Sequence, residues 1–265
     1  MLGTLSKVGT AGLIALFSLS GPLPQGAEEI AALRREIDAL KAQQAAMQKD
    51  LSLIKNLLQA LLQQRPQAQQ EQQNPLENAS IAIAGRPAMG SASAKVTLVE
   101  VSDYHCPFCR RHTQQVFPQI QKDYVDTGKV RYVFVDYPIA QLHPDAAKAH
   151  EAANCAGEQG KFWEMHRSLF TNPPARDQAQ FAVQAKAVGI DVNRFTACLG
   201  SGKYATPVRE SVERIQDLGI SGTPTTLVGL TPAGGGPMKI AKVVVGAQSY
   251  QAFRATIDAV LSEAK

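Results

Sequence analysis

The chain is poor in cysteine and in clustered positive charge. Four cysteines among 265 residues are too few for a disulfide-scaffolded domain and too few for two zinc sites. The formal net charge is only +4, and no run of Lys or Arg concentrates it. Dedicated nucleic-acid binders carry a basic patch or stripe, so we expect no nucleic-acid partner.

Long apolar runs are also scarce. The chain is 45% hydrophobic, which supplies a packed core but does not describe a multi-span membrane protein. The apolar run Val8–Ser20 follows Lys7 and is too short to cross a bilayer core of roughly 30 Å. These features predict a cleaved signal peptide over residues 1–27, with a membrane anchor as the alternative. Export would place the protein in a compartment that permits disulfides, such as a bacterial periplasm.

Residues 28–64 contain no Gly or Pro, and their apolar residues repeat every 3.5 positions. A strict seam of this period predicts a coiled coil, because a core helix follows a 3.6 period. The alternative is a helix folded back on its own domain. Opposite charges flank the seam as in a parallel homo-oligomer, which we expect to be a trimer or a dimer. The ten seam positions are Ile30, Leu33, Ile37, Leu40, Gln44, Met47, Leu51, Ile54, Leu58 and Leu61.

A glutamine-rich segment with two prolines, residues 65–79, predicts a flexible linker. Beyond it the pattern changes to alternating strands and helices, which predicts an α/β domain. The expected order is a strand at 96–101, a helix from 107 to about 125, a strand at 129–135, a helical block over 143–218, a strand at 225–228, a strand at 239–245 and a helix at 249–264. The last two strands are expected to form a hairpin.

Two cysteines, Cys106 and Cys109, stand three residues apart where the first strand leads into a helix. Pro107 suits the first turn of that helix. A thiol at a helix N-terminus meets unpaired N–H groups, which lower its pKa to roughly 3.5–7.5. The spacing therefore predicts a redox pair. The alternative is half of a zinc site, but neither the remaining cysteines nor the histidines show ligand spacing.

Two further residues fit redox chemistry. Glu100 lies on the apolar strand before Cys106, and a buried carboxyl there would exchange a proton with Cys109. The alternative is a strand-end glutamate that faces water. Pro224 stands at the start of a predicted strand, where proline indicates a turn and is compatible with a cis bond.

Together, these runs resemble the DsbA family of periplasmic thiol–disulfide oxidoreductases, in the thioredoxin superfamily. The resemblance rests on Val96–Glu100 leading to Cys106–Cys109, on Ala156–Trp163 and on Gly222–Thr225. It implies a thioredoxin fold over residues 80–265, with a helical domain inserted at about 140–215, preceded here by the coiled-coil helix.

The resemblance also implies roles for individual residues. Cys106 is expected to be the nucleophile, Cys109 the resolving thiol, Glu100 the buried acid and Pro224 a cis-proline beside the redox pair. The residues expected to bind substrate are Thr223, Pro224, Pro107, Phe108 and His105. Cys155 and Cys198 are expected to form a structural disulfide, the alternative being two independent buried thiols.

Three features favour a disulfide isomerase or reductase over a DsbA-like oxidase. The dipeptide Pro107-Phe108 lacks the histidine of the best-known family member, Thr223 precedes the expected cis-proline as in isomerase relatives, and the N-terminal helix is similar to that of trimeric ScsC proteins. The expected partners are unfolded or misfolded secreted proteins and a membrane redox partner, with no cofactor and no metal. The alternatives are a non-catalytic coiled-coil scaffold or holdase chaperone, and a copper- or zinc-handling protein.

Overall fold

The computed structural model describes residues 25–63 and 74–264, which form two compact units. The first unit contains the helix α1 (Gln25–Gln63), and the second is an α/β domain. Most of the predicted signal peptide and most of the predicted linker lie outside the described residues. No helix within the described ranges is long and apolar enough to span a membrane.

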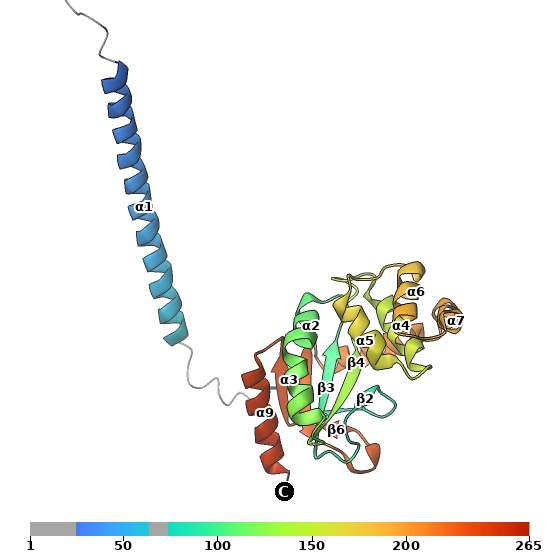
Figure 1. Ribbon diagram of the computed structural model, residues 1–265. Coiled ribbons are helices and arrows are strands. Elements are labelled where there is room, and N and C mark those ends of the chain that lie inside the picture. Colours follow the sequence, from blue (N-terminus) through green and yellow to red (C-terminus); the bar gives the residue numbers. More distant parts are fainter. Residues whose placement is uncertain (1–24, 64–73, 265) are drawn as a thin grey trace, which may run out of the picture. The chain divides into compact units, whose positions relative to one another are not determined.

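Helix α1 is 39 residues long and confirms the predicted N-terminal helix (Figure 1). From Ile30 to Leu58, the apolar residues of its seam are exposed to solvent in the single chain: Ile37 is 48% exposed and Leu40 is 64% exposed. A helix that exposes a continuous row of large apolar side chains is stabilised when that row is covered. The coiled coil itself stays a prediction.

A mixed five-stranded sheet forms the centre of the α/β domain. Its order is β2 (Ala88–Met89), β4 (Val130–Asp136), β3 (Val96–Ser102), β5 (Thr225–Leu230) and β7 (Lys242–Val245). Strand β3 is parallel to β4 and antiparallel to β5, and β5 and β7 are antiparallel neighbours, as the predicted hairpin requires. All seven residues of β3 are buried, which explains its β-branched, apolar sequence.

The predicted strand at 239–245 is divided into two. Strand β6 (Met238–Lys239) pairs with β1 (Ser80–Ile81) in a separate two-stranded sheet, and only β7 continues the main sheet. The β6 backbone crosses closely over Gly229, where any Cβ would collide with the carbonyl oxygen of Lys239. The packed domain also begins before residue 80, because Leu76 is buried in the same core as Ile81.

The helix after the redox cysteines extends to Val125, as predicted, but it is not uniformly α-helical. It runs through α2 (Pro107–Arg111), a π-helical segment (His112–Val116), α3 (Phe117–Ile120) and a second π-helical segment (Gln121–Val125). Pro118 has no N–H and its ring excludes a regular α turn before it. A π turn at this place accommodates that ring, and π turns are frequent at functional sites.

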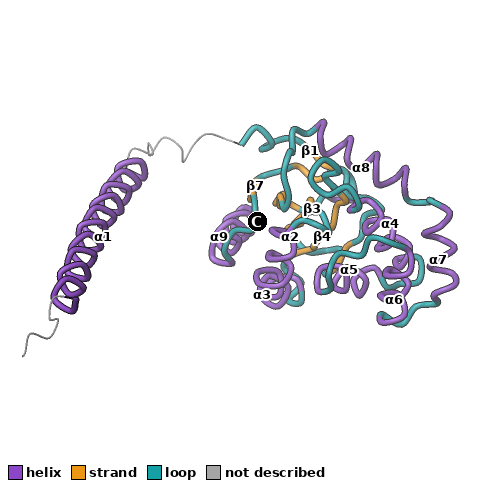
Figure 2. The backbone as a smooth tube through the Cα atoms, turned by 90° about the horizontal axis from the view of Figure 1, so that it is seen from above, coloured by secondary structure: helices purple, strands orange, loops and turns teal. Residues whose placement is uncertain are grey.

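Helices cover both faces of the main sheet (Figure 2). Helices α2, α3 and α9 (Tyr250–Glu263) lie on one face, and α8 (Ala205–Asp217) lies on the other. The first face buries the alternate residues Val96 and Leu98, and the second buries Val99 and Val101. This alternation places residue 100 on the side of the redox helix.

Four helices between β4 and α8 form the inserted helical block, which confirms the predicted α/β architecture. They are α4 (Ala146–Gly157), α5 (Phe162–Thr171), α6 (Gln178–Ala187) and α7 (Val192–Ser201). Asp177 and Asp191 cap the N-termini of α6 and α7 by accepting backbone N–H groups. The aromatic core of the block extends to the main sheet through Phe134 of β4.

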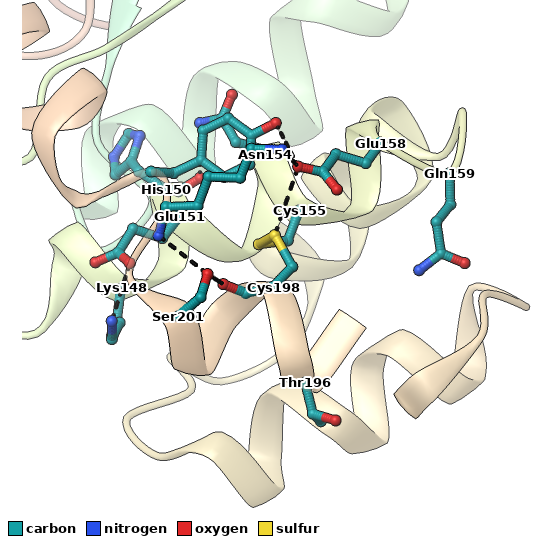
Figure 3. The surroundings of a disulfide bond; sticks show 12 residues. Lys148, His150, Glu151, Asn154, Cys155, Glu158, Gln159, Thr196, Cys198 and Ser201 are labelled. Atoms are coloured by element: carbon teal, nitrogen blue, oxygen red, sulfur yellow. Dashed lines mark hydrogen bonds and ion pairs between the residues drawn. A yellow bond between two sulfur atoms is a disulfide. The ribbon is translucent and has the colours of Figure 1, made fainter. Parts of the chain in front are cut away.

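A disulfide joins Cys155 of α4 to Cys198 of α7 inside this block (Figure 3). The two Cα atoms are 5.9 Å apart, and 43 residues separate the cysteines in sequence. Cys155 is buried in the aromatic core, whereas Cys198 is partly exposed, with Oε1 of Glu158 lying 3.8 Å from its Sγ. Two helices that are not neighbours in sequence are therefore linked covalently.

Candidate active site

Cys106 occupies the N-cap position of α2, directly after the loop that leaves β3. The residue is 5% exposed, and its Sγ lies 3.4 Å from the carbonyl oxygen of Thr223. A hydrogen bond from the Cys109 thiol, together with the backbone N–H groups at the helix N-terminus, lowers the pKa of Cys106 to about 5. Cys106 is therefore a thiolate at neutral pH.

Cys109 differs from Cys106 in its position on the helix and in the direction of its pKa shift. It lies one helical turn deeper, is fully buried, and is reduced like Cys106. Burial, and its donation to Cys106, raise the pKa of Cys109 well above the ordinary thiol value. The two thiols are consequently unequal: one is ready to attack, and the other needs a base before it reacts.

The Thr223–Pro224 peptide bond is cis and stands beside Cys106. Pro224 is buried, and its carbonyl oxygen accepts the N–H of Gly246 at 2.8 Å, which fixes the loop against the end of β7. Thr223 is partly exposed. The loop therefore presents backbone next to the nucleophile.

The remaining predicted substrate-binding residues lie at the start of α2. Phe108 is 54% exposed, unusually open for a large apolar side chain, and the Arg111 guanidinium lies 5.3 Å from its ring centre. Pro107 is exposed and His105 is half-buried. These three residues flank Cys106 along the chain, and the carbonyl oxygen of Thr223 lies 3.4 Å from its Sγ. The structure therefore brings the Thr223–Pro224 loop to the start of α2.

Glu100 is fully buried beneath the redox helix, which excludes the alternative of a strand-end glutamate facing water. Burial raises its pKa from 4.5 to about 7. Its Oε2 accepts a hydrogen bond from the Tyr132 hydroxyl and lies 3.9 Å from Nε2 of His112. A carboxyl that titrates near neutrality beside a buried thiol has the properties of an acid–base group.

Asp103 holds the loop before α2 in place through hydrogen bonds that were not predicted from the sequence. It is fully buried and accepts three hydrogen bonds: from the N–H of His105 and the N–H of Ile139, both at 2.8 Å, and from His143 at 2.9 Å. Asp103 thereby ties the loop that carries Cys106 to the segment that enters the helical block. An aspartate two residues before an N–H donor is the pattern of an Asx turn, which was the available signal.

A second buried network lies behind that loop. His150 on α4 pairs with Asp136 of β4 at 2.6 Å, and its Nε2 accepts the N–H of Tyr104 at 3.4 Å. The Tyr104 hydroxyl in turn contacts His166 at 3.1 Å. These groups come from segments far apart in sequence, so no local pattern indicated them. Across residues 25–63 and 74–264, no cluster of three or more His, Cys, Asp or Glu side chains has the arrangement of a metal site.

The model of the thioredoxin family matches residues 83–259, so the chain belongs to the thioredoxin family. The match covers the sheet, the redox helix, the helical block and most of α9. The predicted thioredoxin fold with a helical insertion is therefore confirmed.

Similar proteins are consistent with this assignment. Disulfide bond formation protein D from Bacillus subtilis is 29% identical over 170 residues, which are 60% of this chain and 74% of the relative. Na(+)/H(+) antiporter NhaA 3 from Salinispora tropica is 36% identical over 139 residues, but these are 52% of this chain and only 21% of that relative's length. The chain thus spans about a fifth of the antiporter relatives that it matches.

Among solved structures, oxidised BdbD from Bacillus subtilis superposes with a TM-score of 0.60 at 26% sequence identity. The superposition covers 71% of this chain and 100% of BdbD. These similarities confirm the resemblance to the DsbA group of thioredoxin-fold proteins, while the ScsC-like subtype stays a prediction.

Proposed function

We propose that this protein is a thiol–disulfide oxidoreductase that exchanges disulfides with substrate proteins. The observation that carries the proposal is the inequality of its two thiols. Cys106 is activated at a helix N-terminus, Cys109 is buried one turn deeper, and the Thr223–Pro224 loop lies against the nucleophile. The similarity to disulfide bond formation protein D supports the same assignment.

The proposed exchange begins with attack of the Cys106 thiolate on a client disulfide. A bond forms between Cys106 and one client sulfur, the client S–S bond breaks, and the other client sulfur leaves as a thiolate that takes a proton from solvent. Cys109 then loses its proton and attacks Cys106. The Cys106–Cys109 disulfide forms, the client is released as a dithiol, and two electrons have passed from the protein to the client.

Glu100 is the base proposed for the second step. Its pKa of about 7 leaves a substantial carboxylate fraction at neutral pH, and its burial beside the redox helix is the position from which a carboxyl acts on Cys109. In the reverse direction the same carboxyl returns the proton to Cys109.

Within this class we propose the isomerase or reductase direction. An isomerase must stay reduced and reach several client disulfides. Assembly of copies of this chain through α1 would gather several redox sites around one misfolded client and would hinder a re-oxidising membrane partner. The apolar seam of α1, exposed in the single chain, supports the assembly. We further propose export to the periplasm through the signal peptide at residues 1–27, with unfolded or misfolded secreted proteins as clients.

The test is reactivation of scrambled, fully oxidised ribonuclease in a mild thiol buffer. We expect the mature protein to restore ribonuclease activity, and Cys106→Ser to abolish the effect. Deletion of residues 28–64 should lower the reactivation and raise the rate at which a reduced substrate is oxidised. If the deletion leaves both rates unchanged, α1 has no part in setting the direction of exchange.

A DsbA-like oxidase is the second candidate, and one observation favours it. A strongly stabilised Cys106 thiolate favours the reduced protein and so makes the Cys106–Cys109 disulfide a stronger oxidant. In this case, a reduced substrate should be oxidised rapidly by the full chain, and scrambled ribonuclease should not be reactivated.

A further inference from the structure

A buried histidine next to Glu100 has no role in the exchange steps above. His112 lies in the π-helical segment that follows α2, three residues after Cys109, and is fully buried. Neither ring nitrogen has a hydrogen-bond partner among the residues that the structure describes. A buried imidazole without partners is costly, and an apolar side chain at this position would avoid that cost.

The His112 ring lies close to the carboxyl group of Glu100. Its Nε2 lies 3.9 Å from Oε2 of Glu100, the same oxygen that accepts the Tyr132 hydroxyl. Its ring packs against Phe253 of α9, with 4.9 Å between ring centres. The distance of 3.9 Å between Nε2 of His112 and Oε2 of Glu100 is longer than a hydrogen bond. Hydrogen bonds that serve a reaction often shorten only when charge develops.

The neighbouring elements bring few ionisable groups to this place. Helix α2 contributes Cys106 and Cys109, both of which act on Glu100 or are acted on by it, and β4 contributes Tyr132. The loop after β3 contributes Tyr104, whose pKa the charge of Glu100 helps to raise. Strand β5 places Thr226 opposite Glu100, and α9 contributes Phe253, neither of which ionises.

No Lys or Arg of residues 25–63 and 74–264 forms an ion pair with Glu100. The charged form of His112 repels that of His166 on α5, which helps to lower the pKa of His166. The carboxylate form of Glu100 therefore depends on neutral hydrogen-bond donors.

We infer that His112 is a positioning residue that joins Tyr132 in presenting neutral donors to Oε2 of Glu100, and so keeps the carboxylate available during the resolving step. This inference rests on the proposed function. Burial lowers the pKa of His112 to about 4, so the ring is uncharged throughout the range in which Glu100 titrates. A neutral imidazole has one donor nitrogen, and Nε2 is the nitrogen that faces the carboxyl.

The proton balance of the step is unchanged by His112. Cys109 gives its proton to the Glu100 carboxylate, its thiolate bonds to Cys106, and the bond between Cys106 and the client breaks. The departing client thiolate takes up one proton from solvent. His112 neither gains nor loses a proton; its N–H stabilises the negative charge on Glu100 before the transfer.

The experiment measures the protonation of the Glu100 carboxyl in the full chain, with the Cys106–Cys109 pair oxidised. Glutamate side-chain carboxyls are labelled with carbon-13 and titrated by NMR, and Glu100→Gln identifies the Glu100 signal. We expect His112→Phe, which removes the donor and keeps an aromatic ring, to raise the Glu100 midpoint by about one pH unit. His112→Gln keeps a neutral donor and should restore the midpoint. His112→Leu is a second apolar variant should His112→Phe fail to fold.

A midpoint that stays unchanged or falls in the folded apolar variant would overturn the inference. The kinetic counterpart is the pH profile of client release from a mixed disulfide at Cys106, which should move upward by the same amount in His112→Phe. In the Glu100→Gln background, His112→Phe should have no further effect. The titration needs no client, so a shifted midpoint without exchange activity would reject the proposed function while showing that His112 stabilises the carboxylate form of Glu100.

Discussion

At the scale of single residues, the site depends on two cysteine thiols that lie in different environments. Cys106 and Cys109 are separated by one helical turn, yet the pKa of one is lowered and that of the other is raised. The difference arises because Cys106 stands at the helix N-terminus and Cys109 is fully buried beneath it.

The thiol asymmetry predicts selective alkylation. In the reduced protein, iodoacetamide should modify Cys106 with a rate whose pH midpoint is near 5, because the pKa of Cys106 is lowered to about 5. Cys109 should stay unmodified in the native state. Peptide mass mapping after timed alkylation measures both, with the Cys106→Ser variant as control. A midpoint near 9 would show that Cys106 is an ordinary thiol and would contradict the proposed activation.

Glu100 predicts a pH-dependent stability. Its pKa is raised on folding, so its favourable contribution is complete below 4.5 and is lost as the pH rises through about 7. This change corresponds to roughly 3 kcal/mol. In the oxidised protein, Glu100→Gln should therefore be more stable than the parent at pH 8, with the difference shrinking towards pH 5.

Urea unfolding at several pH values measures this difference. Glu213→Gln is the matched control, because Glu213 is an exposed residue whose ion pair with Arg209 lies on the surface of α8. An equal stability difference for Glu100→Gln at pH 5 and pH 8 would mean that Glu100 does not titrate near neutrality.

The sequence indicated Glu100 but not the residues that surround it. A charged residue in an apolar strand is visible without a structure, as is a cysteine pair before a helix. Tyr132 and His112 were missed because each belongs to another element, and only the strand register and the helix rotation bring them to the carboxyl. Asp103 was missed although its Asx-turn pattern is local.

At the scale of elements, strand periodicity predicted the central strands of the sheet, but it did not predict how the chain divides at the sheet edge. The run at 239–245 was read as one strand, but it divides because Gly229 lets β6 cross towards β1. The π-helical segments around Pro118 were also outside the prediction, since a period of 3.6 does not distinguish an α turn from a π turn over so few residues.

At the element scale, we expect loss of the disulfide between α4 and α7 to destabilise the protein. In a background of Cys106→Ser and Cys109→Ser, replacing both Cys155 and Cys198 by alanine should lower the free energy of unfolding. The bond spans 43 residues, for which loop-closure entropy gives about 3–4 kcal/mol. Urea unfolding without reductant measures the change. An unchanged urea midpoint, with a thiol assay showing no free thiols in the background protein, would contradict this contribution.

At the scale of the whole molecule, α1 and the α/β domain are separate units, and the direction of exchange is proposed to depend on both. The seam of α1 carries only weak polar pairs at its flanks, and each exposed pair contributes less than about 1 kcal/mol. Association must therefore come from burial of the seam.

The seam predicts a concentration-dependent oligomer. Leu40→Asp with Met47→Asp places two charges at seam positions and should make the protein monomeric in sedimentation velocity. Ala39→Asp with Ala46→Asp adds the same charges one position before each seam residue, off the seam, and should leave the parent oligomer intact. If the parent chain sediments as a monomer at micromolar concentrations, α1 does not assemble the protein.

In the proposed mechanism, Cys106 exchanges disulfides with a client and Cys109 resolves the product. Mass spectrometry of a trapped intermediate tests both steps. Reduced Cys109→Ser protein is mixed with scrambled ribonuclease, quenched with acid and digested. We expect a ribonuclease peptide joined through a disulfide to Cys106, and none in the Cys106→Ser variant, whose remaining thiol is buried. Absence of any peptide joined to Cys106 in the Cys109→Ser protein would contradict this mechanism.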